Sequence, residues 1–245
     1  MDKDKIKEKF LIYSKLKIFE KNIEKSKEIV HLWLSKCNNP YVAFSGGKDS
    51  TCVLNLVREQ KDNITAVYFD ADCAFPEVEF LLNDTKNLIK HKCPESFLEI
   101  LQNMINSDKI EQETMKKTVF IPVKEIIKKY NFDSCAYGLR FEESKARLWN
   151  YKTHGHMFRN ESNILMCQPI VHWSYYDVWA YIISQNIEYC KTYDKMWDMP
   201  EKEQRISYWA GESNINFGRW AWLKKNHLEL FNLLRNKIKE ASLYT

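Results

Sequence analysis

Residues 41–51 constrain the fold of this chain more than any other stretch. Four apolar or aromatic residues run directly into Ser-Gly-Gly-Lys-Asp-Ser-Thr, and residues 53–57 continue with an apolar pattern at helical spacing. This order predicts a buried strand, a tight turn and a helix. Gly46 and Gly47 let backbone N–H groups close around an anion with no Cβ in the way, and the helix start adds the positive end of its dipole. The stretch therefore predicts a cradle for phosphate.

The side chains of this turn add ligands for a phosphorylated molecule. Ser45, Ser50 and Thr51 supply hydroxyl groups, and Lys48 supplies a mobile positive charge. Asp49 is a hard oxygen ligand, and we expect it to hold Mg2+ on the phosphates. The ordinary P-loop has a longer spacer between its first glycine and its Gly-Lys pair. The alternative is a Gly-Gly turn that carries a lysine by chance, and it leaves the flanking strand and helix unexplained.

Two aspartates follow the second predicted strand, residues 64–69. Strand, helix and strand of this length imply a right-handed parallel crossover, which brings the carboxyl ends of both strands to one edge of the sheet. We expect Asp70 and Asp72 to lie beside the cradle, placed to meet a ribose hydroxyl, an adenine edge or Mg2+. The alternative for Asp72 is a structural role as the cap of a helix that begins near Pro76.

A further strand, residues 132–137, leads into Gly138 and two arginines. Because its carboxyl end lies at the same sheet edge, Arg140 and Arg147 are predicted phosphate ligands with planar, permanently charged guanidinium groups. The alternative for Arg147 is a surface ion pair with Glu143, one helical turn before it.

Other elements are predicted from periodicity alone. Residues 5–36 carry apolar side chains at helical spacing and predict one amphipathic helix. Residues 81–89 predict a helix, residues 96–101 a short strand and residues 123–130 a further helix.

Segment 149–161 has no apolar period and is predicted to be a loop near the site. It carries His154 and His156, for which solvation and a role at the site both stay open. After it, Ser174 and Asp177 have the spacing of a capping box and predict the start of a helix.

Aromatic and basic residues alternate in the tail, over residues 205–225. Such a pattern can stack bases and hold backbone phosphates, or it can pack as a helical appendage with its basic groups in water. Trp209, Trp220 and Trp222 are central to both alternatives. We expect the packed appendage, with the buried stripe of a final helix over residues 228–238.

Composition limits the classes of protein to consider. The chain has 245 residues, 44% of them hydrophobic and 29% charged, which is the balance of a globular domain. Seven cysteines are scattered without a C-x-x-C pair, so the sequence predicts neither a disulfide framework nor a zinc site. We find no signal peptide and no apolar run of membrane-spanning length, and expect a cytoplasmic protein with no membrane partner. The net charge of +4 does not by itself indicate a nucleic-acid partner.

The cradle resembles, residue for residue, the PP-loop of the N-type ATP pyrophosphatases, which split ATP into AMP and pyrophosphate. Within that superfamily of adenine nucleotide alpha hydrolases, further segments resemble the phosphoadenosine phosphosulfate (PAPS) reductase-like branch. They are Phe75-Pro76-Glu77, Gly138-Leu139-Arg140 with Arg147, the Pro-Ile, Trp-Ser and Asp-Val-Trp order of residues 169–179, and the Tyr-Asp segment of residues 189–194. The resemblance covers roughly residues 40–195.

This resemblance implies an α/β fold: an open, mostly parallel twisted sheet with helices on both faces, plus a C-terminal helical region. Residues 1–195 are expected to form the PP-loop ATP pyrophosphatase domain with its N-terminal helix, and residues 196–245 a helical appendage. The ligands implied are ATP and Mg2+, with attack at the α-phosphorus and electrostatic stabilisation of the departing pyrophosphate. The implied catalytic residues are Lys48, Asp49, Arg140 and Arg147. The implied nucleotide-binding residues are Ser45, Gly46, Gly47, Lys48, Asp49, Ser50, Thr51, Asp70, Asp72 and Gly138, with Asp49 as the metal ligand.

The chain departs from the branch in its cysteines. Sulfonucleotide reductases carry a catalytic cysteine near the C-terminus, and many carry paired cysteines that hold an iron–sulfur cluster. This chain has no cysteine after Cys190, so we expect no such cluster, and sulfonucleotide reduction is disfavoured. A thiol role for Cys73, close to the predicted pocket, stays open beside the alternative of a small buried residue.

The predicted function is ATP pyrophosphatase activity that adenylates an acceptor. The combination resembles the ATP-using component of DNA phosphorothioation systems, which implies the DNA backbone as acceptor and partner proteins of a modification system. Two alternatives stay open: an ATP sulfurylase-type adenylyltransferase, and a nucleotide-binding module without turnover. The sequence leaves open the acceptor, the sulfur donor and whether the protein forms a homo-oligomer.

Overall fold

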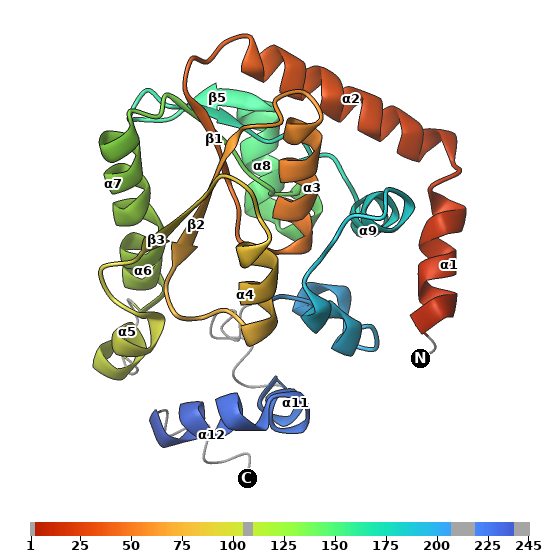
Figure 1. Ribbon diagram of the computed structural model, residues 1–245. Helices are drawn as coiled ribbons and strands as arrows, with labels where there is room; N and C mark the ends of the chain where they lie inside the picture. Colours follow the sequence, from red (N-terminus) through yellow and green to blue (C-terminus); the bar gives the residue numbers. More distant parts are fainter. Residues whose placement is uncertain (1–2, 105–109, 207–218, 238–245) are drawn as a thin grey trace.

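The computed structural model describes residues 3–104, 110–206 and 219–237 (Figure 1). Its centre is a six-stranded sheet in the order β3-β2-β1-β4-β6-β5. The strands are β1 Pro40–Ala43, β2 Thr65–Asp70, β3 Leu88–Lys92, β4 Ser134–Ala136, β5 Met157–Arg159 and β6 Leu165–Cys167. Neighbouring strands pair in parallel except β5 and β6, which pair antiparallel. The predicted open, mostly parallel α/β sheet is confirmed.

Helices cover both faces of this sheet (Figure 1). In the first part of the chain they are α1 Lys3–Tyr13, α2 Lys17–Leu34, α3 Lys48–Arg58, α4 Pro76–Asn83, α5 Phe97–Met104, α6 Ile110–Met115, the π-helix Lys116–Phe120 and α7 Ile121–Tyr130. Further on they are α8 Lys145–His154, α9 Tyr175–Ser184, α11 Arg219–Asn226 and α12 Leu228–Lys237. Short 3-10 helices span Phe141–Glu143, Lys191–Lys195 and Glu201–Glu203.

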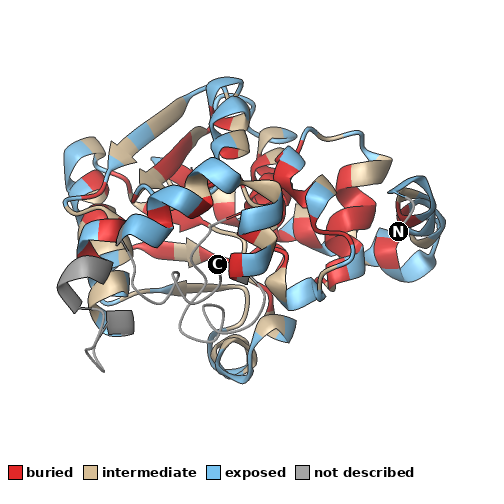
Figure 2. Ribbon diagram, turned by 90° about the horizontal axis from the view of Figure 1, so that it is seen from below, coloured by how far each residue is buried: buried red, intermediate tan, exposed pale blue. Residues whose placement is uncertain are grey.

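Side chains of the central strands alternate between two hydrophobic clusters, as the pleat of a strand requires. Tyr41 and Val67 pack with Ile126 of α7 on one face. Val42 and Ala66 belong to the larger cluster on the other face, together with side chains of α2, α3 and α9. Figure 2 shows buried residues gathered along the sheet and the inner sides of the helices, with exposed residues outside. Both faces of the sheet are therefore covered, as parallel sheets require.

The N-terminal prediction of one helix over residues 5–36 is wrong, because the chain breaks between α1 and α2. Phe10 of α1 packs among the rings of Tyr175, Trp179 and Trp197, which fixes α1 against α9. Ile12, which the periodicity assigns to the apolar stripe, is 59% exposed. Contacts with a distant helix, rather than local periodicity, decide where the first helix ends.

Two assignments before residue 105 are also wrong. The predicted helix over residues 81–89 ends as α4 at Asn83, and the chain then forms β3, which pairs with β2 at the edge of the sheet. The predicted strand over residues 96–101 is part of α5. The Ser96 hydroxyl accepts from the Glu99 N–H at 3.2 Å and the Glu99 carboxylate accepts from the Ser96 N–H at 2.7 Å. The Ser-x-x-Glu spacing of this capping box is present in the sequence and is typical of a helix start, so it is a better guide here than the apolar residues that suggested a strand.

Segment 149–161, predicted as a loop, forms the end of α8 and strand β5 instead. His154 is exposed, while His156 is half-buried and its ring lies 5.3 Å from that of His172. The helix predicted from Ser174 is confirmed as α9, with Ser174 and Asp177 forming the expected capping box.

The C-terminal helices pack on the rest of the molecule. Trp220 of α11 and Phe231 of α12 are 4% and 1% exposed and belong to the larger cluster. The Trp222 ring packs against Phe75, and its Nε1 donates to the Lys195 carbonyl at 3.0 Å. These contacts favour the packed appendage for the tail, while Trp209 lies outside the described residues. The division at residue 195 stays a prediction.

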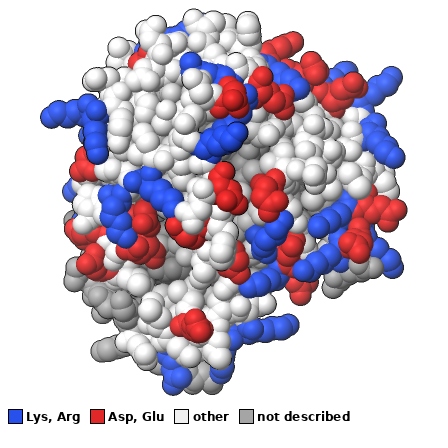
Figure 3. Space-filling model, viewed as in Figure 1, with Lys and Arg blue, Asp and Glu red and all other residues white. Residues whose placement is uncertain are grey.

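Charged side chains of both signs are interspersed over the face of the molecule seen in Figure 3. Among the described residues, no helix combines the length and the apolar character needed to cross a membrane.

Candidate nucleotide site

The cradle lies where the order of the sheet reverses. β1 has β2 on one side and β4 on the other, and the chain passes from the end of β1 through residues 44–47 into α3. In open α/β sheets, ligands bind in the crevice outside the carboxyl ends of strands at such a switch point. Both the strand and the helix of the predicted phosphate cradle are thus confirmed as elements.

Two glycines set the shape of this turn. Gly46 has φ of +75°, a left-handed conformation that L side chains rarely adopt. Gly138, at the exit of β4, faces the first turn of α3 so closely that a Cβ there would lie 2.7 Å from the carbonyl carbon of Asp49. Only glycine therefore lets β4 and α3 approach to this distance.

Hydroxyl groups brace the turn from inside. Ser50 Oγ accepts from the Ser45 N–H at 3.2 Å and donates to the Gly47 carbonyl at 2.9 Å. Ser45 Oγ lies 3.1 Å from Ser50 Oγ and 3.3 Å from the Gly47 nitrogen, from which it accepts. Thr51 Oγ1 is buried, and none of the described residues gives it a hydrogen-bond partner. Ser45 and Gly47 line the cavity at this edge; Gly46, Ser50 and Thr51 support it from behind.

Asp49 joins the two buried cations of the site. Its Oδ2 lies 2.9 Å from Lys48 Nζ and its Oδ1 lies 2.5 Å from Arg140 Nε. The side chains of Lys48 and Arg140 are only 6% and 4% exposed. Arg140 also pairs with Glu142. Two buried cations therefore lie beside the predicted phosphate cradle, each paired with a carboxylate.

The pKa values of this cluster follow from burial and pairing. Burial alone would raise the pKa of Asp49, but Lys48 and Arg140 outweigh it and lower the pKa below its usual value. Burial would lower the pKa of Arg140, but Asp49 and Glu142 raise it above its usual value. Asp49 and Arg140 are therefore both charged at neutral pH.

Arg147 has both of the contacts that the sequence left open. It forms an ion pair with Glu143, one turn earlier in sequence, and it also lines the cavity. Burial lowers the pKa of Arg147, and the positive charge of Arg205 lowers it further. Arg205 thus approaches Arg147 from the C-terminal part of the chain, and both line the same cavity.

Asp70 and Asp72 lie away from this cavity lining. Both pair with Lys92 of the neighbouring strand β3, and Asp72, at φ of +55°, donates its backbone N–H to Asp70 Oδ1 at 3.0 Å. Asp72 does not cap α4 either, because the N-cap position belongs to Phe75. The wall from this strand consists of Tyr68 and Phe69. The sequence placed both aspartates beside the cradle, whereas in the structure they pair with Lys92 of β3, a strand that periodicity misassigned as helix.

The cavity has a volume of about 490 Å³, within the range of about 300–1,000 Å³ for small-molecule sites. Tyr68 and Phe69, in the last part of β2, and Ala74, just after the strand, line one part of it. The remaining lining includes Gly138, Leu139, Arg140, Glu142, Glu143, Arg147, Tyr175, Tyr193, Glu201, Lys202, Gln204, Arg205 and Ile206. One cavity thus joins an apolar part to a strongly charged part.

Sequence reasoning missed the lining residues after residue 174. Tyr193 Oη accepts from the Lys48 N–H at 3.1 Å. Gln204 is buried and accepts from the Tyr175 hydroxyl at 2.8 Å, which fixes the segment that carries Arg205. The Tyr-Asp segment of residues 189–194 was the available signal for Tyr193. Nothing in the local pattern around Gln204 indicates the cavity.

The cysteines do not form a second cluster. No disulfide links any of the seven, and of these only Cys73 lines the described cavity, where it is half-buried. His154 and His156 do not contribute to the lining.

Asp49, the predicted Mg2+ ligand, forms ion pairs with two cations. Both oxygens of Asp49 accept from buried positive groups. In the described part of the chain, no three His, Cys, Asp or Glu side chains lie together as metal ligands would. The described residues therefore do not fit a resident metal ion, and Asp49 as a Mg2+ ligand stays a prediction.

The fold and this site define an adenine nucleotide alpha hydrolase-like protein, with the predicted phosphate cradle at the sheet's switch point. More narrowly, the chain belongs to the phosphoadenosine phosphosulfate reductase domain family, whose model matches residues 39–199.

Curated relatives include sulfate adenylyltransferase subunit 2 of Aliivibrio fischeri, 25% identical over 185 residues that make up 64% of this chain and 60% of that protein. An uncharacterized protein of Methanocaldococcus jannaschii is 28% identical over 223 residues, 87% of this chain and 52% of that protein. The chain thus spans between about half and three-fifths of the length of these relatives.

Two solved structures share the fold. A PAPS reductase from Candida auris, in a phosphate complex, superposes with a TM-score of 0.55 and 17% identity over 79% of this chain and 92% of that chain. An FMN adenylyltransferase from Candida glabrata, in complex with ATP, superposes with a TM-score of 0.54 and 15% identity over 72% of this chain and 58% of that chain. The likeness confirms the α/β nucleotide-binding fold.

Proposed function

We propose that this protein binds ATP in the cavity at the carboxyl end of β1 and cleaves it between the α- and β-phosphates, transferring the adenylyl group to an acceptor. The observation that carries the proposal is the arrangement of Lys48 and Arg140 around Asp49, directly at the first turn of α3. A helix N-terminus with two buried cations is suited to the phosphates of a nucleotide.

The shape of the cavity supports a nucleotide. Its aromatic part at Tyr68 and Phe69 suits an adenine ring, and its charged part suits phosphates. Relatives named as sulfate adenylyltransferase, and a structural neighbour named as FMN adenylyltransferase with ATP, have adenylyl transfer in common. That shared reaction class supports ATP rather than another nucleotide as the substrate.

The chemistry requires an oxygen of the acceptor to attack the α-phosphorus. A new P–O bond forms there, the bond to the bridging oxygen breaks, and pyrophosphate leaves with the electron pair. Charge therefore develops on the pyrophosphate, where Lys48, Arg140 and the first-turn amides of α3 can stabilise it. Asp49 pairs with both cations, and it keeps them in position for the triphosphate.

The acceptor is the finer part of the proposal. Sulfate is favoured by the relatives named as sulfate adenylyltransferase subunit 2. The DNA backbone, with partner proteins of a modification system, stays a prediction from sequence resemblance.

The test is product analysis of the purified protein with ATP and Mg2+, resolving AMP, ADP, phosphate and pyrophosphate. We expect AMP and pyrophosphate from the wild type and neither from Lys48→Ala. Lys27→Ala removes a lysine of comparable size from a surface pair with Glu59 and should leave turnover unchanged. ADP and phosphate as products, or full activity of Lys48→Ala, would contradict the proposal. Stimulation by sulfate, but not by DNA, would identify the sulfate acceptor.

A further inference from the structure

The phenol of Tyr193 occupies part of the phosphate cradle. Lys48 is the first residue of α3, so its backbone N–H has no partner within the helix. That N–H donates to Tyr193 Oη at 3.1 Å. A Cβ on Gly47 would lie 3.6 Å from the same oxygen, which confirms that the phenol lies against the turn itself. The oxygen takes a position on α3 that suits a phosphate oxygen.

The protein core holds the phenol there. Tyr193 is 2% exposed, and its ring packs edge-on against Trp179 at 5.1 Å between centroids. Its own backbone is fixed in a 3-10 helix by hydrogen bonds with Cys190 and Met196. Lys48 Nζ lies 6.0 Å from the centroid of the ring. These contacts therefore hold the phenol oxygen at the Lys48 amide.

We infer that Tyr193 is an internal occupant of the cradle, which a phosphate group must displace from the Lys48 amide before it can use that donor. The inference rests on the proposed function insofar as phosphate is the group that enters. It makes Tyr193 a residue that sets nucleotide affinity, because the hydrogen bond lost by the phenol opposes the hydrogen bond gained by the phosphate.

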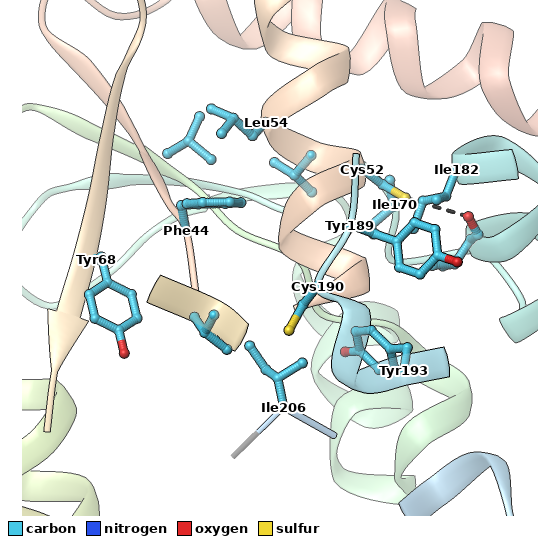
Figure 4. Packing of buried hydrophobic residues seen from close by; sticks show 14 of the residues in the cluster. Phe44, Cys52, Leu54, Tyr68, Ile170, Ile182, Tyr189, Cys190, Tyr193 and Ile206 are labelled. Atoms are coloured by element: carbon cyan, nitrogen blue, oxygen red, sulfur yellow. Dashed lines mark hydrogen bonds between the residues drawn. The ribbon is translucent and has the colours of Figure 1, made fainter. Parts of the chain in front are cut away.

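The chain offers a matched pair of variants. Tyr189 lies on the same segment, and its ring packs on the same Trp179 at 5.3 Å and nearly the same angle. Its hydroxyl donates to Asp194 Oδ1 at 2.7 Å and not to the cradle. Figure 4 shows the two hydroxyl groups pointing to opposite sides of the view. Tyr193→Phe and Tyr189→Phe each remove one buried hydroxyl, and only the first frees the Lys48 amide.

The experiment measures binding of pyrophosphate by calorimetry and the thermal midpoint with and without pyrophosphate. Tyr193→Phe is expected to bind pyrophosphate about three- to tenfold more tightly than the wild type, the equivalent of one net hydrogen bond. Its midpoint should fall without ligand and rise more steeply with ligand. Tyr189→Phe should lower the midpoint equally in both conditions and leave affinity unchanged.

Unchanged or weaker binding of pyrophosphate by Tyr193→Phe would overturn the inference while leaving the proposed function intact, provided that the wild type binds pyrophosphate. A wild-type protein that binds neither pyrophosphate nor ATP would overturn both. An equal gain in affinity in Tyr189→Phe would also overturn it, because the gain would then come from a looser core rather than from the cradle.

Discussion

Gly138→Ala tests whether the close approach of β4 to α3 builds the site. The added Cβ would lie 2.7 Å from the Asp49 carbonyl carbon, 2.8 Å from its oxygen and 2.9 Å from the Ser50 nitrogen. All three atoms are backbone, so no side chain can swing aside. To reach the 3.4 Å of an ordinary contact, the first turn of α3 must move by 3.4 − 2.7 = 0.7 Å relative to β4.

Two effects follow from that shift. Overpacking of this kind costs about 1–3 kcal/mol in the free energy of unfolding. The same movement displaces Asp49 from Arg140 and the cradle amides from the phosphates, and a misplacement near 1 Å can cost about 100-fold in rate. We therefore expect a folded protein with a lower urea midpoint, and with ATP turnover and pyrophosphate affinity reduced at least tenfold, on the order expected for such a displacement.

Gly155→Ala is the matched control. Gly155 also cannot accept a Cβ freely, since its φ is +71°, but nothing lies within 4 Å of the added atom. Its cost is backbone strain of about 1–3 kcal/mol at the end of α8, away from the cavity lining. Loss of stability in both variants with loss of binding in Gly138→Ala alone supports the reasoning. Wild-type binding in a folded Gly138→Ala protein would refute it.

Three further perturbations follow from the structure. Burial, together with Lys25 and His156, lowers the pKa of His172 from 6.5 to about 4. Because the unfolded chain takes up the proton first, the free energy of unfolding should fall as the pH drops from about 6.5 to 4. Urea midpoints of His172→Gln measured over this range should therefore depend less on pH than those of the wild type. Asp49→Asn removes the carboxylate that pairs with buried Lys48 and one of the carboxylates that pair with buried Arg140, and it should lower the free energy of unfolding by about 3–5 kcal/mol, with part of the loss recovered by added pyrophosphate in thermal melts. Cys73 lines the cavity, so ATP should slow its alkylation, as read by mass spectrometry, while Cys37, outside the cavity, should be unaffected; equal protection of both thiols would contradict the site.

Local sequence predicted the strand, turn and helix of the cradle because these parts are contiguous in the chain. The strand, the Gly-Gly turn and the start of α3 lie within a dozen residues, and each has a conformational reason that operates at short range. Arg140 was found the same way, from a strand exit followed by a glycine. The roles assigned to these residues stay predictions until the assays above are made.

Short-range signals failed where a partner far along the chain decides the outcome. Asp70 and Asp72 pair with Lys92 because residues 88–92 join the sheet as an edge strand. Pairing of this strand with β2 overrides the helical spacing of Leu88 and Ile89 with the leucines before them. The first helix ends at Tyr13 because Phe10 packs against α9, more than 160 residues later.

By itself, the sequence determined the class of fold, the position of the phosphate cradle and the charge of the groups beside it, since periodicity, glycine placement and residue chemistry act over a few residues. Only the tertiary structure decided which side chains complete the cavity. Tyr193 reaches the Lys48 amide, and Arg205 approaches Arg147, because the segment after α9 folds back across the sheet edge. Such contacts depend on the packing of whole elements, which no local pattern in the chain encodes.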